Sequence, residues 1–348
     1  MHLSESPSSS LQRTEILCKI CGDVAQGYHF GAYSCHACGA FFRRSVSNQQ
    51  LYTCLRNQRC KVANGHNRGM CKSCRFARCI NEGMNINVIV VKPSDEFRCF
   101  EADSVLRKIL LASRGTYTNR YAAVLKLNGG NRSSVRLGVE NPIARDTMIA
   151  LMSEASVLKQ YICDSGFSAL GLTSKEILDF TRELFYPWIC YQSAMATLRN
   201  SGHRRQIAFF VDESNICVNE TAIRKYVESY DKFLDFELIV RYTEMHFNAT
   251  LQQAARIAHI RPEEYETALL FQLFALKTAS ALFAHHRPAI TRETSRLFND
   301  LKNHYVHNHD NVATRLGNLV LILTDFEQSL KTANEFFTIL KLNGFLIK

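Results

Sequence analysis

Eight cysteines in paired spacings constrain the fold of this chain more than any other feature of its sequence. Of its thirteen cysteines, nine lie between positions 18 and 79. Eight of these form four pairs: Cys18-x2-Cys21, Cys35-x2-Cys38, Cys54-x5-Cys60 and Cys71-x2-Cys74. Four soft thiolates with no open position suit a structural Zn²⁺ ion. The spacing therefore predicts two closed zinc sites of four cysteines each, and the remaining Cys79 is predicted to be a buried thiol.

The same segment is strongly basic. Between Cys18 and Lys92 there are eleven basic and two acidic residues, a net charge of +9, whereas the whole chain has a formal net charge of +10. A compact basic segment next to a nearly neutral remainder favours a polyanionic partner, most simply a nucleic-acid backbone. On charge alone, an ordinary solvated surface is an equally good interpretation.

Two helices are expected within this segment. The first, residues 36–46, begins inside the second cysteine pair, so a metal would hold its first turn. Its two faces differ: His36, Ala40, Arg43, Arg44 and Ser47 share one, and Phe41, Phe42, Ser45 and Val46 share the other. The second helix, residues 72–83, begins at the second zinc site, ends at a glycine, and directs Phe76 and Ile80 inward. One face of the first helix can thus pack inward while the other meets DNA.

Residues 18–35, the Phe-Phe-Arg-Arg run at 41–44 and residues 71–84 resemble the DNA-binding domain of nuclear hormone receptors. In that family the first helix lies in the major groove and reads a six-base half-site. The resemblance implies that Arg44 reads a base. It implies backbone or near-backbone contacts for four further residues: His29, Arg43, Arg68 and Arg75.

The first helix departs from the usual family pattern. Most members have Glu-Gly inside the second cysteine pair and a base-reading Lys directly after it, but here these positions are His36-Ala37 and Gly39. With a further alanine at position 40, this helix resembles those of the divergent nematode receptors. We predict that His36 and Arg44 dominate base discrimination. The complete predicted DNA-binding set is His29, His36, Gly39, Ala40, Arg43, Arg44, Arg68 and Arg75.

The rest of the chain reads as helical. Residues 93–145 are expected to form a hinge, with a short helix around Val105–Ser113. Further on, Thr173 and Glu176 have capping-box spacing before a long apolar stripe, which Pro187 is expected to bend or split. Pro262 fits the first position of another helix. The short stretches 206–211 and 216–218 are expected to pair as a hairpin, so the second domain is predicted to be all-α apart from this β-turn segment.

The order of these elements resembles, more weakly, a nuclear receptor ligand-binding domain. In that fold, three layers of helices enclose an apolar cavity for a lipophilic ligand, but the sequence assigns no ligand-binding residues. The last residues have no acid after Glu335, and Gly344 interrupts any helix there. This C-terminus argues against ligand-switched recruitment of a helical coactivator motif. His285 and His286 are adjacent, so they are expected to point apart on a helix and to form no site.

Four regions are expected: a disordered tail at 1–14, a two-zinc DNA-binding domain with its C-terminal extension at 15–92, a hinge at 93–145, and a helical ligand-binding-type domain at 146–348.

The predicted function is that of a nuclear, zinc-dependent, sequence-specific transcription factor that regulates transcription by RNA polymerase II and holds two structural Zn²⁺ ions. Expected partners are double-stranded DNA, coregulators, a homo- or heterodimer partner and a small lipophilic ligand. No apolar run reaches the roughly 18 residues of a membrane span, and no motif of an enzyme is found. The alternative is a zinc-knuckle module for protein interaction or ubiquitin transfer.

Overall fold

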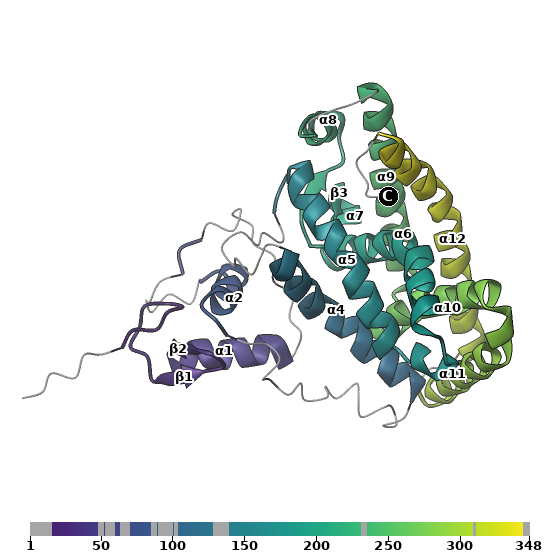
Figure 1. The fold of residues 1–348 in the computed structure, drawn as a ribbon, viewed down its shortest axis with the longest axis horizontal. Coiled ribbons are helices and arrows are strands. Elements are labelled where there is room, and N and C mark those ends of the chain that lie inside the picture. Colours follow the sequence, from purple (N-terminus) through teal and green to yellow (C-terminus); the bar gives the residue numbers. More distant parts are fainter. Residues whose placement is uncertain are drawn as a thin grey trace, which may run out of the picture. The chain divides into compact units, whose positions relative to one another are not determined.

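The computed structural model describes residues 16–47, 52, 60–62, 70–84, 89, 100, 104–127, 139–230, 235–308 and 311–343. The chain divides into two compact units, residues 1–92 and 93–348, which we call unit 1 and unit 2 (Figure 1). The expected tail at 1–14 and the last five residues, including Gly344, lie outside the described residues.

Unit 1 contains a small hairpin and the two predicted helices. Strands β1 (Gly27–His29) and β2 (Ala32–Ser34) are antiparallel, with Tyr28 opposite Tyr33. Helix α1 spans His36–Ser47 and helix α2 spans Lys72–Asn81, so both predictions from the cysteine spacing are confirmed. The stop signal for α2 is also confirmed: Gly83 has a φ of 107°, a value that favours glycine, and the Met84 amide then donates to the Cys79 carbonyl at 3.0 Å.

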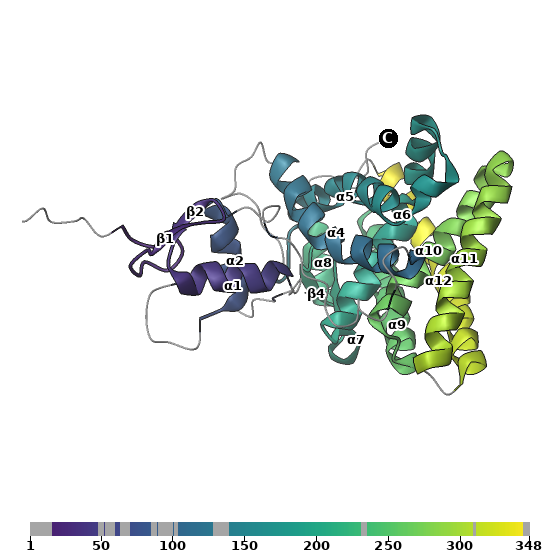
Figure 2. The same ribbon diagram turned by 90° about the horizontal axis from the view of Figure 1, so that it is seen from below.

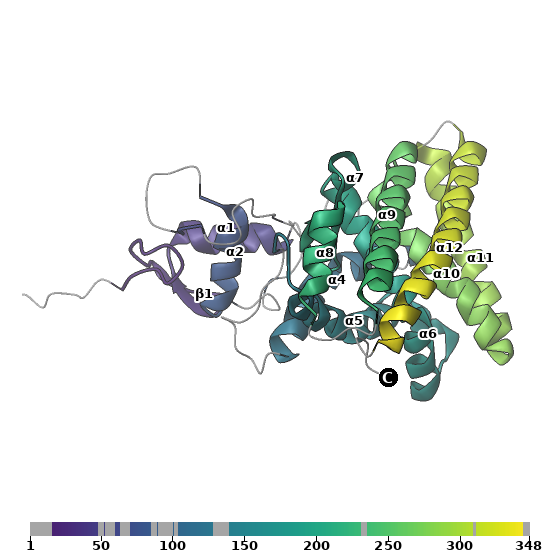
Figure 3. The ribbon, with the colours of Figure 1, turned by 90° about the horizontal axis from the view of Figure 1, so that it is seen from above.

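Unit 2 is helical, as predicted. Its helices are α4 (Val105–Leu127), α5 (Ala144–Asp164), η3 (Phe167–Leu170), α6 (Ser174–Arg199), α7 (Gly202–Arg205), α8 (Glu220–Glu228), α9 (Phe236–Ile260), α10 (Glu264–Leu282), η4 (Ala284–His286), α11 (Arg287–Asn308) and α12 (Val312–Leu342). Helices α6 and α10 lie between the α4–α5 pair and the α9–α12 pair (Figure 2). Unit 2 thus forms three layers, and α9 and α12 run side by side in the outer one (Figure 3).

Several local predictions for unit 2 are confirmed. The Thr173 hydroxyl accepts from the Glu176 amide, and the Glu176 carboxylate accepts from the Thr173 amide, which completes the capping box of α6. The hairpin is present as antiparallel β3 (Ile207–Phe209) and β4 (Asn215–Cys217). Helix α6 continues through Pro187 as a single helix, so of the two expected outcomes the split does not occur. One proline prediction needs correction: Pro262 precedes Glu263, the N-cap of α10, instead of occupying its first turn.

The expected hinge also differs from the structure. Residues 105–127 form one 23-residue helix, α4, more than twice as long as the short helix anticipated there. Its Leu106, Ile109 and Leu110 are each 1% exposed and belong to the core of unit 2. This core therefore includes residues that precede position 146.

The centre of unit 2 combines an aromatic cluster with a buried ion pair. Trp188 is fully buried, and its ring centroid lies 5.0 Å from that of Tyr161 and 4.9 Å from that of Phe271. The Trp188 indole donates to Glu154 at 2.7 Å, and Glu154 also accepts two hydrogen bonds from the Arg120 guanidinium. Because Glu154 and Arg120 are 0% and 2% exposed, each charge depends on the other for compensation.

Among the described residues, no single helix is both long and apolar enough to span a membrane. One bent pair, 264–282 with 284–306, meets that length and composition test only when its two helices are joined.

Candidate metal centre and nucleic-acid interface

The first cysteine cluster is assembled from three local structures of unit 1. Cys18 and Cys21 lie in the turn before β1, Cys35 follows β2, and Cys38 is in the first turn of α1. All four thiols are buried, and their sulfur atoms all lie within 4.8 Å of one another. The Sγ atoms of Cys21 and Cys35 are 3.6 Å apart. Ligands at the usual Zn–S distance of about 2.3 Å lie about 3.8 Å apart in a tetrahedron, so this donor set fits Zn²⁺.

This cluster is tied directly to the start of α1. The Cys38 and Gly39 amides donate to the Cys35 carbonyl at 3.1 and 3.0 Å, and the Cys38 amide also lies 3.4 Å from the Cys35 sulfur. Arg75, from α2, donates to the Cys38 sulfur at 3.3 Å. A metal held by these thiolates would therefore fix both the position of α1 and its approach to α2.

The second cluster contains Cys60, Cys71 and Cys74, whose sulfur atoms also lie within 4.8 Å of one another. Cys71 is the N-cap residue of α2, and its carbonyl accepts from the Arg75 amide at 2.9 Å. The predicted fourth ligand, Cys54, lies outside the described residues. Two cysteine clusters of this kind are suited to two zinc ions.

The interior of unit 1 is small and aromatic. Phe42 of α1 is fully buried, and its ring centroid lies 5.7 Å from that of Phe76 in α2 and 5.8 Å from that of Phe30. Cys79 lies on the buried face of α2, is fully buried and belongs to neither cluster; burial raises the pKa of its thiol to about 12. This placement agrees with the prediction of an inert buried thiol.

The outer face of α1 is polar and basic. His36, Ala37, Arg43 and Arg44 are exposed, and Ala40 and Ser47 are half-buried. The opposite face is buried and includes Phe41, Phe42, Ser45 and Val46, as the helical spacing predicted. Ala37 was absent from the predicted DNA-binding set. Its exposure on this face could have been predicted from the sequence, because positions 37, 40 and 44 follow the helical spacing of three and four residues.

Gly39 and Arg75, both in the predicted DNA-binding set, also make packing contacts within unit 1. Gly39 is buried, and a Cβ atom there would lie 3.2 Å from the ring of His29. The guanidinium of Arg75 lies over the ring of Phe41, 4.5 Å from its centroid, besides contacting the Cys38 sulfur. Both residues therefore pack inside unit 1. Sequence spacing could not reveal this, because the partners come from other elements.

The remaining predicted residues are placed as follows. His29 is half-buried; its Nδ1 lies 3.0 Å from the Ser34 hydroxyl, and its ring centroid lies 5.4 Å from that of His36. The structure thus places His29 beside the first turn of α1. Arg68 lies outside the described residues.

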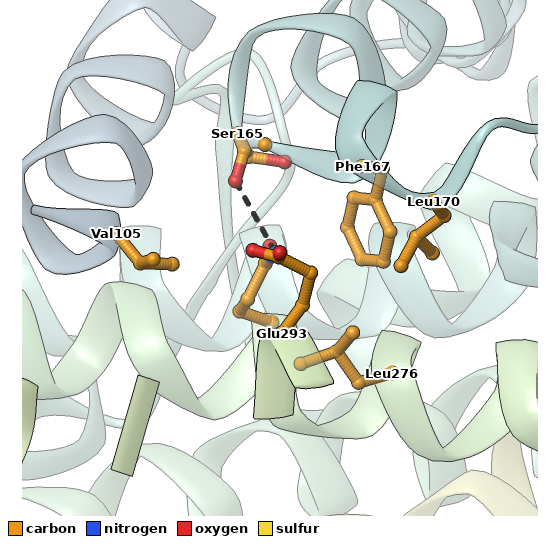
Figure 4. A pocket seen from close by; sticks show the side chains of 8 residues that line it. Val105, Ser165, Phe167, Leu170, Leu276 and Glu293 are labelled. Atoms are coloured by element: carbon orange, nitrogen blue, oxygen red, sulfur yellow. Dashed lines mark hydrogen bonds between the residues drawn. The ribbon is translucent and has the colours of Figure 1, made fainter. Parts of the chain in front are cut away.

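Two cavities in the interior of unit 2 are small. A cavity of about 40 Å³ lies between α5, α6, α9 and α12, lined by aromatic side chains that include Phe209, Tyr226, Phe247 and Phe336. Another, of about 10 Å³, lies among Ser165, Phe167, Leu276 and Glu293 (Figure 4). Ligand sites usually measure about 300–1,000 Å³, so neither cavity admits a lipophilic ligand in this conformation.

Two family models match this chain. Residues 16–86 match the double treble clef zinc finger of the C4 type, and residues 190–343 match the ligand-binding domain of nuclear hormone receptors. The second match covers the end of α6 and all of α7 to α12, and it does not extend to α4 and α5.

Individual relatives match a shorter stretch. Nuclear hormone receptor family member nhr-86 of Caenorhabditis elegans is 47% identical over 83 residues, which are 24% of this chain and 20% of that protein. Member nhr-16 of the same organism is 52% identical over 68 residues, 20% of this chain and 17% of its own length. Nuclear receptor subfamily 5 group A member 2 of Mus musculus is 44% identical over 75 residues, 22% and 13% of the two lengths. The chain thus spans a fifth or less of these relatives.

Proposed function

Because this chain belongs to the nuclear hormone receptor family, we propose that it is a zinc-dependent transcription factor that binds duplex DNA with α1 in the major groove. The observation that carries this proposal is the exposed face of α1. His36, Arg43 and Arg44 stand on the solvent side of a helix whose first turn is tied to a cysteine cluster. An α-helix fits the major groove, and these side chains would donate hydrogen bonds to its base edges and phosphates.

Each exposed residue of α1 has a distinct chemical role in this proposal. Arg44 would bind guanine through its two parallel N–H donors, and Arg43 would bind phosphate. Ala37 and Ala40 would place their methyl groups against a thymine methyl, and His36 would hydrogen-bond a neighbouring base. This face differs from the usual reading helix, so we expect a half-site that differs from those of familiar receptors.

The residues around α1 are proposed to have two kinds of role, contact with DNA and packing within unit 1. His29 and Arg68 are proposed to contact the DNA backbone at the edge of the interface. Within unit 1, Gly39 is proposed to let α1 pack closely against His29, and Arg75 is proposed to join α2 to Cys38 of α1. Two structural zinc ions would be held by the eight predicted ligands, Cys18, Cys21, Cys35, Cys38, Cys54, Cys60, Cys71 and Cys74.

Unit 2 is proposed to supply the regulatory interactions of a factor that acts in the nucleus on RNA polymerase II transcription. Its expected partners are coregulators and a homo- or heterodimer partner. A small lipophilic ligand would enter only if the side chains around the 40 Å³ cavity, Phe336 among them, moved apart. Binding of such a ligand would therefore change the packing of α12 against α9.

The experiment that tests the proposal measures binding of the full chain to fluorescent duplex DNA over a series of salt concentrations. The test variant is Arg43→Ala/Arg44→Ala. The matched control, Arg292→Ala/Arg296→Ala, removes the same charge from two exposed positions of α11. Each phosphate contact that a variant no longer makes should lower the salt slope of log K by about 0.9, and removal of one base-reading arginine should cost about 1–3 kcal/mol.

We expect the α1 variant to bind at least tenfold more weakly than the wild-type chain, and the α11 control to retain wild-type binding. Chelation of zinc should abolish binding of all three proteins. Equal binding by the wild-type chain and the α1 variant would contradict the proposal. Zinc-loaded protein that binds no duplex would instead favour a zinc-knuckle module for protein interaction.

A further inference from the structure

Three metal-ligating side chains meet in unit 2, far from the cysteine clusters in sequence. Glu176 lies in the first turn of α6, and His285 and His286 form the end of η4, between α10 and α11. The Nε2 atom of His285 lies 2.7 Å from Glu176 Oε1, and that of His286 lies 3.3 Å from the same oxygen. One ligand atom from each of the three residues falls within 4.8 Å of the other two.

This convergence corrects the prediction that the two histidines point apart. Adjacent residues do diverge on a continuous helix, but α10 ends at Leu282, and the chain turns through the short 3₁₀ segment η4 before α11 begins. The two imidazole rings are 4.2 Å apart between centroids. Both therefore face the same carboxylate.

An apolar contact holds this turn against α6. Phe283, which immediately precedes η4, is 6% exposed, and its ring centroid lies 5.8 Å from that of the fully buried Phe180. Phe180 lies four residues after Glu176 and hence on the same side of α6. The Phe283 carbonyl accepts from the His286 amide at 3.0 Å, so Phe283 also fixes the backbone of the turn. The geometry of the three ligands is thus set by core packing.

The carboxylate is also held by residues other than the histidines. Glu176 Oε2 accepts from the Thr173 amide at 2.8 Å and from the Thr173 hydroxyl at 2.7 Å, and it lies 3.4 Å from His286 Nε2, while Oε1 is the nearer oxygen to both imidazoles. These hydrogen bonds lower the pKa of Glu176 to about 2, so the carboxylate is charged at neutral pH. Hydrogen bonds that fix an otherwise free ligand in this way are typical of the surroundings of metal sites.

We propose that Glu176, His285 and His286 bind a divalent transition-metal ion, with Zn²⁺ as the best-suited candidate. Two imidazoles and one carboxylate form a ligand set that Zn²⁺ accepts, and ligands about 2.0–2.1 Å from the ion would lie about 3.4 Å apart. The His286–Glu176 distance of 3.3 Å matches that value, and the His285–Glu176 hydrogen bond of 2.7 Å would lengthen by about 0.7 Å on coordination.

The site would leave one coordination position open to water, because the side chain of His285 is 67% exposed. Binding requires each imidazole to present an Nε2 lone pair, so the N–H···O hydrogen bonds to Glu176 give way to coordination and each neutral imidazole carries its proton on Nδ1 instead. The positive end of the α6 dipole opposes a cation, and the charge of Glu176 offsets it. The bound ion would join the start of α6 to the turn between α10 and α11 and stabilise unit 2.

The proposal is tested by counting zinc in the full chain. The protein, with its cysteine clusters loaded, is dialysed against buffer containing micromolar free Zn²⁺ and analysed by elemental mass spectrometry. The test variant is His285→Ala/His286→Ala, and a second variant, Glu176→Gln, removes the anionic ligand. His259→Ala, at an exposed position of α9, is the matched control for histidines that bind zinc weakly at the surface.

The wild-type chain and the His259→Ala control should retain one zinc equivalent more than either site variant. Added Zn²⁺ should also raise the unfolding midpoint of unit 2, followed through Trp188, in the wild-type chain and in the control only. Equal zinc content in the wild-type chain and the double-histidine variant would overturn the proposal and leave a hydrogen-bonded cluster without a metal. An unchanged midpoint on addition of zinc to the wild-type chain would overturn it as well.

Discussion

The two units of this chain compensate their buried polar groups in opposite ways. In unit 1, the four thiols of Cys18, Cys21, Cys35 and Cys38 are buried close together, and thiols are common metal ligands. Arg75 donates a hydrogen bond to one of them, Cys38. In unit 2, the buried carboxylate of Glu154 has its own partners, Arg120 and Trp188. We therefore propose that unit 1 depends on a metal ion from outside the chain, whereas the buried carboxylate of unit 2 is compensated by Arg120 of the same chain.

The sizes of the two cores explain this difference. The described core of unit 1 centres on Phe42 and Phe76, whereas that of unit 2 extends from Phe100 to Leu340 and draws on every layer. Segments as short as unit 1 seldom bury enough apolar surface to fold alone and are commonly stabilised by metal. A larger core can absorb the cost of burying an ion pair. The two units should therefore respond to different perturbations.

Removal of zinc should give the largest effect, the unfolding of unit 1, while unit 2 stays folded. Structural zinc contributes about 10–16 kcal/mol in small metal-dependent domains, so a strong chelator should unfold unit 1 and abolish duplex binding. Trp188 is the one tryptophan of the chain and is buried in unit 2, so its fluorescence reports on that unit alone. We expect its emission to remain native under chelation. A red shift comparable to that in denaturant would show that the two units are not separately stabilised.

The reverse perturbation is the replacement Glu154→Ala. It leaves the Arg120 guanidinium buried without its carboxylate, which should destabilise unit 2 by about 3–5 kcal/mol while unit 1 keeps its zinc and its affinity for DNA. Denaturant unfolding followed by Trp188 fluorescence measures the loss. The matched control, Glu237→Ala, breaks a surface pair with Arg224 in which the glutamate is 68% exposed, and should cost less than about 1 kcal/mol. Equal losses in the two variants would refute the role assigned to Glu154.

A smaller effect is a loss of stability of unit 2 at low pH. His246 is buried against Phe336, with 4.4 Å between ring centroids, and burial lowers its pKa to about 4. Because this value is below the ordinary one of about 6.5, its contribution to stability is complete above pH 6.5 and is lost as pH falls towards 4. Between pH 7.5 and 5 the loss should be about 2 kcal/mol.

The measurement compares denaturant unfolding of the wild-type chain and His246→Phe at these two pH values. Asp212 titrates with the opposite sign, because burial raises its pKa to about 6, so that acid relieves its cost. Asp212 is present in both proteins, and its effect cancels in the comparison. A wild-type chain and a variant that lose the same stability between pH 7.5 and 5 would contradict the assignment to His246.

The features that sequence predicted are those with a local cause. The cysteine spacings gave the clusters and the start of α1, the Thr173–Glu176 spacing gave the start of α6, and helical periodicity gave the exposed face of α1. Each of these depends on residues within a few turns of one another. Local rules were therefore sufficient for the starts of α1 and α6 and for the exposed face of α1.

The features that sequence missed depend on partners distant in the chain. Arg120 is a basic residue within an expected hinge, and only its contact with Glu154, 34 residues away, makes it part of a core. The sequence predicts Arg75 as a DNA contact and does not reveal its hydrogen bond to Cys38, which lies 37 residues away. His285 lies 109 residues from Glu176, and the turn that directs it there depends on the packing of Phe283. Periodicity carries no information on such tertiary contacts.

The central claim is that the exposed face of α1 reads DNA. Selection of bound sequences from a pool of randomised duplexes, carried out with the zinc-loaded full chain, tests it most directly. The comparison uses the wild-type chain, His36→Ala/Arg44→Ala, and the Arg292→Ala/Arg296→Ala control from α11. We predict that the wild-type chain and the control enrich one half-site, and that the α1 variant loses the preference at the bases it would contact, at a cost of about 1–3 kcal/mol for each bidentate contact. Enrichment of the same half-site by the α1 variant would contradict the claim.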